Sequence, residues 1–416
     1  MLAVMATPFV APRRTSRAAV TFILITMVLD AISLGIILPV FPKLVEQFVA
    51  GDTADAARIF GLFGTGWALM QFIFQPIVGM ASDSFGRRPI ILLSNVGMGL
   101  DYILMALAPN LAVLFAGRLI SGLCASSFAT ATAYVSDITP QNQRAAAFGK
   151  IGAAFGFGFV LGPAIGGLLG ASDPRLPFWV AACFSLVNAA YGYFVLPESL
   201  LRERQASFEW RRANPLGALR LLRTHVTLIG LATVLFLEHL AHMVLPSIFV
   251  FYAGYRYGWD ARAVGFALAA VGLFAAIVQG WLVPPMIHRF GERRTLLVGL
   301  LCGAAGFAFY GWAPNQTAFI LAIPVMALWG VASPPAQGIM TRLADPKEQG
   351  QLQGANSCLT AIGSLIAPGL FTQTFAYFIT GAETARIPGA PFYFSALLLA
   401  LATVLAWWST RTIENA

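Results

Sequence analysis

The chain has 416 residues, of which 58% are hydrophobic and only 11% are charged, and its formal net charge is +8. Soluble domains carry about 25% charged residues. This composition, with a mean hydropathy of +0.75, excludes an ordinary soluble enzyme or binding domain. The four cysteines show no spacing typical of zinc or redox sites. The sequence therefore predicts an all-α protein of the membrane.

Twelve apolar stretches are long enough to cross a bilayer, which takes roughly 20 residues. They must be helical, because lipid offers no partner for unpaired backbone groups. They cover residues 18–41, 58–80, 89–108, 111–136, 145–170, 177–196, 226–253, 261–287, 294–312, 316–341, 350–379 and 391–410.

The distribution of basic residues predicts the orientation of the chain. Most of the 26 Lys and Arg residues fall in segments that are cytoplasmic if the N-terminus is inside, as the positive-inside rule requires. Both termini are then cytoplasmic, and the basic balance needs no nucleic acid partner. The first apolar stretch follows Arg13, Arg14 and Arg17 like a signal peptide, but its length indicates a retained helix.

A polar segment at 197–225 divides the helices into bundles at 1–196 and 226–416, and we expect it to form an amphipathic linker on the cytoplasmic surface. The bundles are related by an offset of 205 residues. The sequence SFGRRPIILLS begins at Ser84 and RFGERRTLLVG at Arg289. Such internal repeats are typical of transporters, whose sites lie between the halves near the bilayer midplane.

Ionisable residues inside a membrane are costly and are functional candidates by default. Those in this chain are Asp30, Asp101, Arg118, Glu238, His239 and His242. Asp101 and Arg118 lie at similar depths on neighbouring helices, so an ion pair between them is expected. It is either part of proton or substrate handling, or a static salt bridge that joins helices 3 and 4.

Asp30 lies near the middle of helix 1 without a cation at the same depth on that helix. Such a carboxylate can exchange a proton near neutral pH, as a proton-coupled carrier requires. The alternative is a polar residue that only packs or kinks the helix.

Helix 7 contains the sequence FLEHLAHM, in which Glu238 and His242 are four residues apart and share a face. A Glu–His pair can shuttle protons. His239 points elsewhere, and for it an interhelical hydrogen bond is the simpler interpretation. The H-x-x-H spacing permits metal ligation, but no further ligand stands out, so no metal site is predicted.

Two glycine-rich segments predict close packing. The first, GFGFVLGPAIGG in helix 5, brings small residues and a proline to one helix and favours rocking of one half against the other; its residues are Gly158, Gly162, Pro163, Gly166 and Gly167. The second, GMASDSFGRRP between helices 2 and 3, predicts a cytoplasmic gate built from Gly79, Asp83, Gly86, Arg87, Arg88 and the partner Asp137. Ordinary topogenic charge is the alternative for the second segment.

These segments resemble the signatures of the major facilitator superfamily. GMASDSFGRRPIILL is similar to its motif between helices 2 and 3, and LFAGRLISG, with Arg118, to its helix 4 motif. GFGFVLGPAIGG resembles the helix 5 motif of its drug–proton antiporters. Together with LDAISLGIILPVFP, GLDYILMALAP and GYRYGWDARAVGFALAAVGL, they resemble the twelve-helix tetracycline efflux proteins over nearly the whole chain.

The resemblance implies a major facilitator fold with two pseudo-symmetric six-helix bundles around a central cavity. Helices 1, 4, 7 and 10 should line the cavity, and helix pairs 2/11 and 5/8 should form the interface. It also implies that Asp30, Asp101 and Arg118 bind drug or proton. The chain departs from the family pattern at Ala275 and Gly303, where well-known members have a histidine and an aspartate, and at His288, which replaces Asp83 in the second motif copy.

The expected function is export of a small amphiphilic drug such as tetracycline in exchange for protons, by a monomer in the bacterial inner membrane. No cofactor is expected, although the substrate can carry a divalent cation. The alternatives are a proton-coupled importer of a small metabolite and a metal-dependent membrane enzyme that uses Glu238, His239 and His242. Further candidates for the cavity wall are Gln71, Phe249, Trp329, Pro335 and Gln337.

Overall fold

The structure is a computed structural model that describes residues 17–125, 127–140, 143–200, 226–345, 348–380 and 386–411. The described part is helical throughout. The first bundle consists of α1 (Arg17–Ile37), α2 (Phe41–Phe48), α3 (Thr53–Phe85), α4 (Arg87–Leu107), α5 (Leu111–Cys124), α6 (Ser127–Ile138), α7 (Arg144–Gly170) and α8 (Leu176–Val195). Most of the expected linker, residues 201–225, lies outside the described residues.

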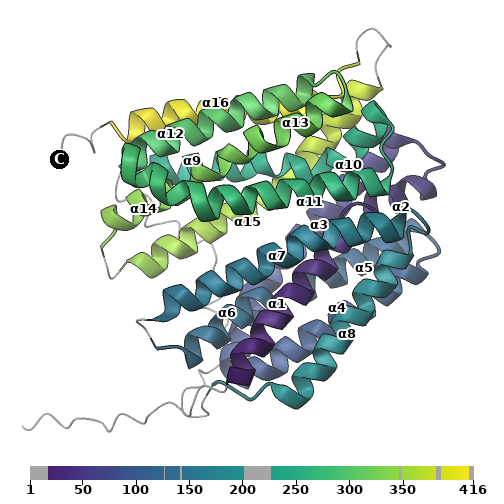
Figure 1. The fold of residues 1–416 in the computed structure, drawn as a ribbon. Coiled ribbons are helices and arrows are strands. Elements are labelled where there is room, and N and C mark those ends of the chain that lie inside the picture. The colour runs from purple at the N-terminus through teal and green to yellow at the C-terminus, as the bar shows by residue number, and fades with distance from the viewer. Residues whose placement is uncertain are drawn as a thin grey trace, which may run out of the picture.

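The second bundle begins at Val226 and is shown above the first in Figure 1. It consists of α9 (Val226–His242), α10 (Val244–Tyr257), α11 (Ala261–Ile277), the π-helical segment η5 (Val278–Leu282), α12 (Val283–Trp312), α13 (Gln316–Ala327), the 3₁₀ segment η6 (Leu328–Val331), α14 (Ser333–Leu343), α15 (Gln349–Ile379) and α16 (Ala390–Ser409). The start of α1 and the end of α16 lie at one end of the molecule (Figure 1), called here the terminal end; the opposite end is the distal end.

Eleven helical spans of the described chain are long and apolar enough to cross a membrane. One of them, Ala261–Trp312, has 52 residues and is far longer than the roughly 20 that one crossing needs. It contains both predicted stretches, 261–287 and 294–312, and its helix is interrupted at Gly291, where φ is 76° and ψ is 166°. The twelve predicted crossings are therefore accounted for.

Four spans are each built from two helices instead of one: α1 with α2, α5 with α6, α9 with α10, and α13 with α14. They are the first and fourth spans of each bundle, so the interruption follows the internal repeat. Irregular backbone at membrane depth is tolerated only where protein buries it or where it lines a cavity. These spans correspond to helices 1, 4, 7 and 10, which were expected to face the centre.

The two bundles meet along two helix pairs, α3 with α15 and α7 with α11, as the resemblance implied for pairs 2/11 and 5/8. The two bundles approach each other most closely at positions where one of the paired helices has a glycine. A Cβ atom at Gly64 would lie 2.7 Å from Cβ of Pro368, and one at Gly167 would lie 2.5 Å from the carbonyl oxygen of Ala261. Phe60 and Phe251 add an edge-to-face contact between the bundles, with ring centroids 5.4 Å apart.

The helix 5 glycines pack as predicted. Gly158, Gly162 and Gly166 of α7 face α1, and a Cβ atom at any of them would lie closer than 3 Å to α1 backbone or to Ala31. Gly167 instead faces α11. At the other end of α7 the opposite holds, because Cβ atoms at Gly149 and Gly152 would meet nothing within 4 Å.

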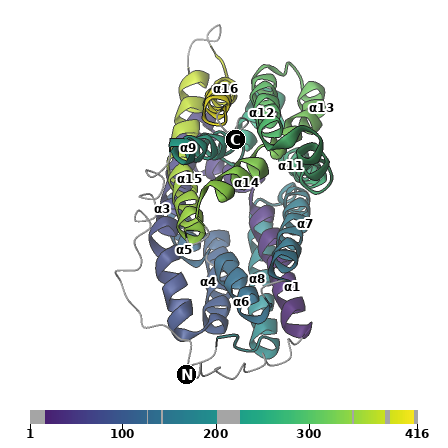
Figure 2. The same cartoon turned by 90° about the vertical axis from the view of Figure 1, so that its left-hand side faces the viewer.

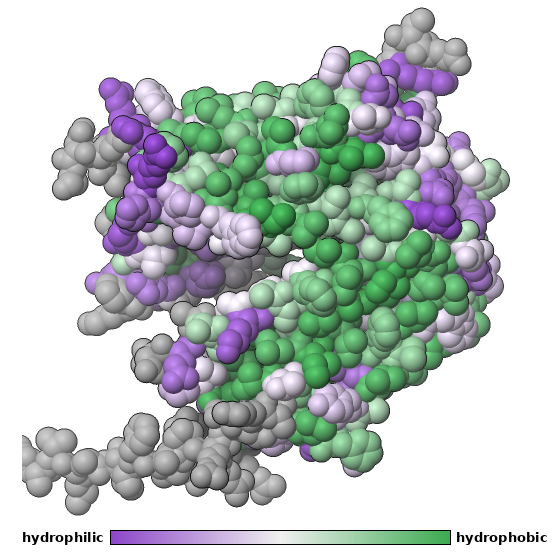
Figure 3. Space-filling view, viewed as in Figure 1, coloured by the Kyte–Doolittle hydropathy of each residue, from purple (hydrophilic) through white to green (hydrophobic). Residues whose placement is uncertain are grey.

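The surface in Figure 3 has an apolar band across the middle and polar residues gathered at both ends, as a membrane protein requires. The same view shows a hollow between the two bundles that opens at the terminal end. Figure 2, which looks onto that end, shows α14 and α15 above α4 and α6. The bundles are thus closed against each other at the distal end and apart at the terminal end.

The contact between α7 and α11 gives a first testable prediction. Gly265→Ala would place a Cβ atom 2.9 Å from Cα of Gly167 and closer still to the backbone of Pro163. Since backbone cannot move aside locally, we expect a loss of about 1–3 kcal/mol in stability. The measurement is the temperature at which purified protein leaves the monodisperse peak in size-exclusion chromatography.

Gly152→Ala is the matched control on α7, because its Cβ atom would point into open space. It should leave stability unchanged or raise it by up to about 1 kcal/mol through higher helix propensity. Equal losses for the two variants would show that the α7–α11 approach does not hold the bundles together.

Candidate functional site

A cavity of about 100 Å³ lies between the two bundles. From the first bundle it is lined by α1, α2, α3, α4 and α5, which contribute Leu34, Phe41, Trp67, Tyr102 and Arg118 among others. From the second bundle it is lined by α10 and α15, through Met243, Pro246, Ser247, Ser364 and Pro368. It is smaller than typical ligand pockets of roughly 300–1,000 Å³, so a drug-sized molecule must extend from it into the hollow.

Arg118 carries the only charge among the described residues that line this cavity. Its guanidinium carbon lies 4.8 Å from the centre of the Trp67 ring and 5.3 Å from that of Phe41. Cation–π contacts of this kind partly replace the hydration that the cation loses. They hold a positive charge at the cavity wall.

Asp101 lies on α4 and is 1% exposed. Asp101 and Arg118 interact electrostatically, and Ser121 also interacts with the carboxylate, but no ion pair within 4.0 Å joins Asp101 to Arg118, and neither carboxylate oxygen has a hydrogen-bond partner within 3.5 Å among the described residues. The neighbouring hydroxyl of Ser121 donates to Sδ of Met98 at 4.0 Å. The expected ion pair, and with it the static salt bridge, is therefore wrong for this conformation, because the aromatic rings hold the guanidinium instead.

The structure nevertheless brings the three first-bundle candidates into one region. Tyr102 lines the cavity, is 2% exposed, and lies within electrostatic range of Asp30, Asp101 and Arg118. Two carboxyl groups and one guanidinium therefore act electrostatically on a single buried phenol. Sequence analysis missed Tyr102 because a tyrosine next to an aspartate carries no pattern of its own.

The helix 7 candidates lie where that span is interrupted. α9 ends at His242 and α10 begins at Val244. The cause is Pro246, which has no N–H to donate to the carbonyl of His242 one turn earlier. Glu238 lies one turn before the break, is 4% exposed, and has no charged partner among the described residues.

The two histidines have separate contacts. Nε2 of His239 lies 2.9 Å from Oγ of Ser364 on α15, so the interhelical hydrogen bond predicted for it is confirmed. His242 stacks on the indole of Trp329, with ring centroids 4.7 Å apart and planes at 27°. Because these side chains face different partners, they do not converge, and no group of three metal-ligating side chains occurs among the described residues.

Trp329 also explains the departure at Gly303. A Cβ atom at Gly303 would lie 2.5 Å from Cδ1 of Trp329 and 2.7 Å from Cδ1 of Leu399. The indole thus fills the place where the resembled family has an acidic side chain. Trp329 belongs to η6, the irregular segment of helix 10, so the breaks in helices 7 and 10 meet at the stacked pair with His242.

The weaker candidates for the cavity wall do not line it. Phe249 is buried among aromatic side chains, 6.2 Å from Trp259 and 5.6 Å from Phe319 between ring centroids. Gln71 lies on α3 and accepts a hydrogen bond from Gln75 at 3.5 Å. On α14, Pro335 is buried in the helix start and Gln337 is exposed. Residues missed in their place include Trp67 and Ser364.

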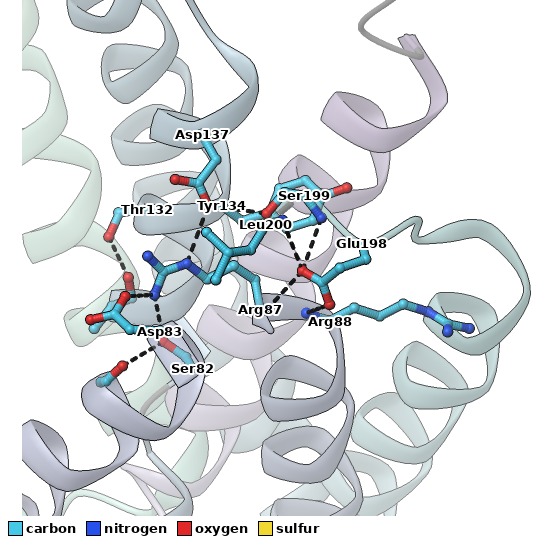
Figure 4. Close-up of polar contacts among 12 residues, drawn as sticks. Ser82, Asp83, Arg87, Arg88, Thr132, Tyr134, Asp137, Glu198, Ser199 and Leu200 are labelled. Carbon is cyan, nitrogen blue, oxygen red and sulfur yellow. Dashed lines mark hydrogen bonds and ion pairs between the residues drawn. The ribbon is translucent and has the colours of Figure 1, made fainter. Parts of the chain in front are cut away.

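The predicted gate is formed around Arg87 at the terminal end (Figure 4). Its side chain contacts Asp83 at 2.5 Å and Asp137 at 3.2 Å, and it donates to Oγ of Ser82 at 2.6 Å. Gly86 has a φ of 104°, which favours glycine. The loop between α3 and α4 is thereby tied to the end of α6.

Two members of the predicted gate behave differently. Arg88 does not reach Asp137; it donates to the carbonyl of Tyr193 at 2.6 Å and lies over that ring at 5.6 Å. A Cβ atom at Gly79 would meet nothing within 4 Å, so the close contact expected there is absent in this conformation.

Glu198 is a gate residue that sequence analysis missed. Its carboxylate accepts hydrogen bonds from the backbone N–H groups of Arg87 at 2.9 Å and Arg88 at 3.1 Å, and from those of Ser199 and Leu200. It therefore caps the N-terminus of α4 from the chain that follows α8 (Figure 4). The only signal was a carboxylate directly after the sixth helix.

Glu198→Ala should uncap α4. Since Glu198 is exposed, we expect the first turn of α4 to lose only about 1 kcal/mol of local stability. This loss corresponds to roughly fivefold faster exchange of the Arg87 and Arg88 amides. Hydrogen–deuterium exchange measured by mass spectrometry would show this. Glu198→Gln keeps an acceptor oxygen and should lie between wild type and alanine; wild-type exchange in the alanine variant would contradict the capping role.

The second motif copy repeats the gate with its charges exchanged. Gly291 adopts a positive φ like Gly86. Glu292 and Arg342 form a two-pronged ion pair, with one contact at 2.8 Å. These two residues stand at the repeat positions of Arg87 and Asp137. The repeat thus preserves the pairing of a loop with the fourth helix, although not the sign of each charge.

The duplicated bundles, the broken central helices and the charged cavity between them define a secondary transporter. A profile of the Major Facilitator Superfamily matches residues 23–368 and, in a second alignment, 231–415. The chain belongs to this superfamily. It is accordingly a multi-pass membrane transporter and not an enzyme.

Comparison with known proteins agrees with this assignment. The tetracycline resistance protein, class C, of Escherichia coli is 36% identical over 87% of this chain and 90% of its own length. The class D protein of Salmonella ordonez is 33% identical over 94% of this chain and 97% of its own length. The crystal structure of the human organic anion transporter MFSD10 (TETRAN) has a TM-score of 0.70 at 24% identity, covering 95% of this chain and 100% of that chain.

Proposed function

We propose that the protein exports a small amphiphilic drug, of which tetracycline is the leading candidate, in exchange for protons. It works by alternating access as a monomer in the bacterial inner membrane, with both termini in the cytoplasm. No resident cofactor is required, and a divalent cation can enter bound to the substrate. The terminal end is then cytoplasmic, and the structure is open toward the side from which a drug is taken up.

The observation that carries the proposal is the similarity, over most of the chain, to two tetracycline resistance proteins. The site supports it in physical terms. Asp30 and Asp101 both interact electrostatically with Tyr102, which lines the cavity together with Arg118 and aromatic side chains. Carboxyl groups kept from water can change their charge between conformations, and a ligand shifts the equilibrium only through different affinities for the two states.

The two alternative functions have less support. An importer of a small metabolite would use the same fold, but the helix 5 glycine segment resembles that of exporters. A metal-dependent enzyme would need Glu238, His239 and His242 to converge, whereas His239 contacts Ser364 and His242 contacts Trp329.

The test is transport by purified protein in liposomes, with tetracycline and Mg²⁺ outside and a pH-sensitive dye inside. For molecules oriented with the terminal end outward, addition of tetracycline should release protons from the interior. Tetracycline should accumulate when the interior is acidic. Asp30→Asn should lose this pH-driven accumulation, because asparagine cannot exchange a proton.

The proposal would be rejected if the rate and extent of tetracycline uptake by wild type did not depend on the pH gradient. Accumulation driven by a gradient of the opposite sign would instead support the importer. The role of the divalent cation is tested with a drug that binds no metal. If a chelator leaves proton release by that drug unchanged, the divalent cation belongs to the substrate and not to the protein.

A further inference from the structure

The hydroxyl of Ser364 occupies an unusual position between the cavity and the helix 7 cluster. Ser364 lies on α15 and lines the central cavity. On its other side its Oγ lies 2.9 Å from Nε2 of His239. Ser364 thus links the cavity wall to a titratable side chain of the second bundle through a hydrogen bond.

The direction of this hydrogen bond depends on the protonation of His239. With neutral His239 carrying its proton on Nδ1, Nε2 is an acceptor and Ser364 donates to it. The lone pairs of Oγ then face the cavity. When His239 gains a proton at Nε2, that N–H donates to Oγ, and the hydroxyl proton of Ser364 turns toward the cavity. Gain of one proton by the imidazole thus converts the cavity wall from an acceptor to a donor.

We propose that the His239–Ser364 pair is a polarity switch that binds a hydrogen-bond donor of the substrate, such as a hydroxyl, amide or ammonium N–H, only while His239 is neutral. The inference rests on the proposed function, because it assigns the chemistry by which proton and drug exclude each other. The substrate donor bonds to Oγ in the neutral state. Protonation of His239 from water in the cavity breaks this bond, since two donors then face each other.

His239 has titratable and charged neighbours on several helices, and it interacts electrostatically with His242. On its own helix it neighbours Glu238 and His242. On α10, Arg256 donates to the carbonyls of Trp312 and Ala313, and on α14 Arg342 pairs with Glu292. Neither α15 nor α16 carries a charged residue, and their titratable side chains are Cys358, Tyr377 and Tyr393. Across the cavity lie Tyr102 and Arg118.

The pair also gives the substrate a defined orientation. Arg118 is the charged group on the first-bundle side of the cavity, and Ser364 lies on the second-bundle side. An amphiphile with an anionic or enolate oxygen at one end and a hydrogen-bond donor at the other would contact both bundles at once. Such a molecule shifts the equilibrium between states because its two contacts belong to parts that move relative to each other.

The experiment measures the dissociation constant of tetracycline, with Mg²⁺ present, for the full chain in nanodiscs at about pH 5 and about pH 8, the limits between which histidine side chains change their charge. Wild type should bind more weakly at the lower pH. Ser364→Ala should reduce the ratio of the two constants roughly fivefold, the effect of one hydrogen bond. His239→Gln should reduce it similarly, because an amide both donates and accepts at either pH.

Ser364→Thr keeps the hydroxyl and should retain the wild-type ratio. Ser395→Ala is a matched control, because Ser395 is a buried serine of α16 without a hydrogen-bond partner among the described residues. A wild-type ratio in Ser364→Ala overturns the switch while leaving drug–proton exchange intact. Failure of wild type to bind tetracycline at either pH overturns the proposed substrate and the switch together.

Discussion

Asp101→Asn is expected to abolish pH-driven drug transport while the protein still folds. The carboxyl group is 1% exposed, and neither of its oxygens has a hydrogen-bond partner within 3.5 Å among the described residues. A buried charge without hydrogen bonds is costly, so this group is suited to gain and lose a proton as the cavity changes. Asparagine has the same shape but cannot titrate.

The measurement is accumulation of labelled drug in liposomes with an acidic interior. We expect a loss of at least about tenfold, since about 1.4 kcal/mol of lost coupling already has that effect. Exchange of labelled for unlabelled drug without a pH gradient should persist, because the cavity keeps its shape. Asp55→Asn is the control: Asp55 is exposed and pairs with Arg58 at 2.6 Å. Unchanged accumulation in Asp101→Asn would remove this carboxyl from the coupling mechanism.

Gly303→Asp should disrupt the second bundle, although the resembled efflux proteins have an aspartate there. The new Cβ atom would lie 2.5 Å from Trp329 and 2.7 Å from Leu399. Overpacking costs about 1–3 kcal/mol, and an unpaired buried carboxyl adds to it. We expect a loss of more than about 3 kcal/mol, seen as a low folded yield and early thermal loss of the monodisperse peak.

Trp329→Ala in the same chain should recover part of this loss. The free energy of unfolding of the double variant should exceed the value expected from adding the two single effects by about 1 kcal/mol or more. Ala275→His is the control at the other family position, because Ala275 is only partly buried, unlike Gly303. Additive effects at 303 and 329 would show that the indole does not occupy the missing side chain's place.

The candidate site could be predicted in part. Intramembrane charge identified Asp30, Asp101 and Arg118, because the cost of placing a charge in lipid makes each one conspicuous in the sequence. The same reasoning could not foresee that Phe41 and Trp67 hold the guanidinium. Aromatic residues are common in membrane helices, and only packing shows which of them face a cation.

Small residues and prolines were informative for a different reason. Gly162 and Gly167 were predicted to allow close approach, and their Cβ positions are blocked by α1 and α11 respectively. Gly79 was assigned the same role, but its surroundings are empty. The sequence marks where helices are able to approach, whereas the conformation decides which end of the molecule is closed at a given moment.

By itself, the sequence determined the membrane class, the twelve crossings, the duplication and the superfamily. These depend on composition and on local patterns that lipid enforces along the chain. Only the tertiary structure decided that His239 contacts Ser364, that His242 stacks on Trp329, and that Glu198 caps α4. Each of these contacts joins residues that are at least 87 positions apart in the chain. Which side chains meet across a bundle follows from the packing of the helices and not from the spacing of residues along one helix.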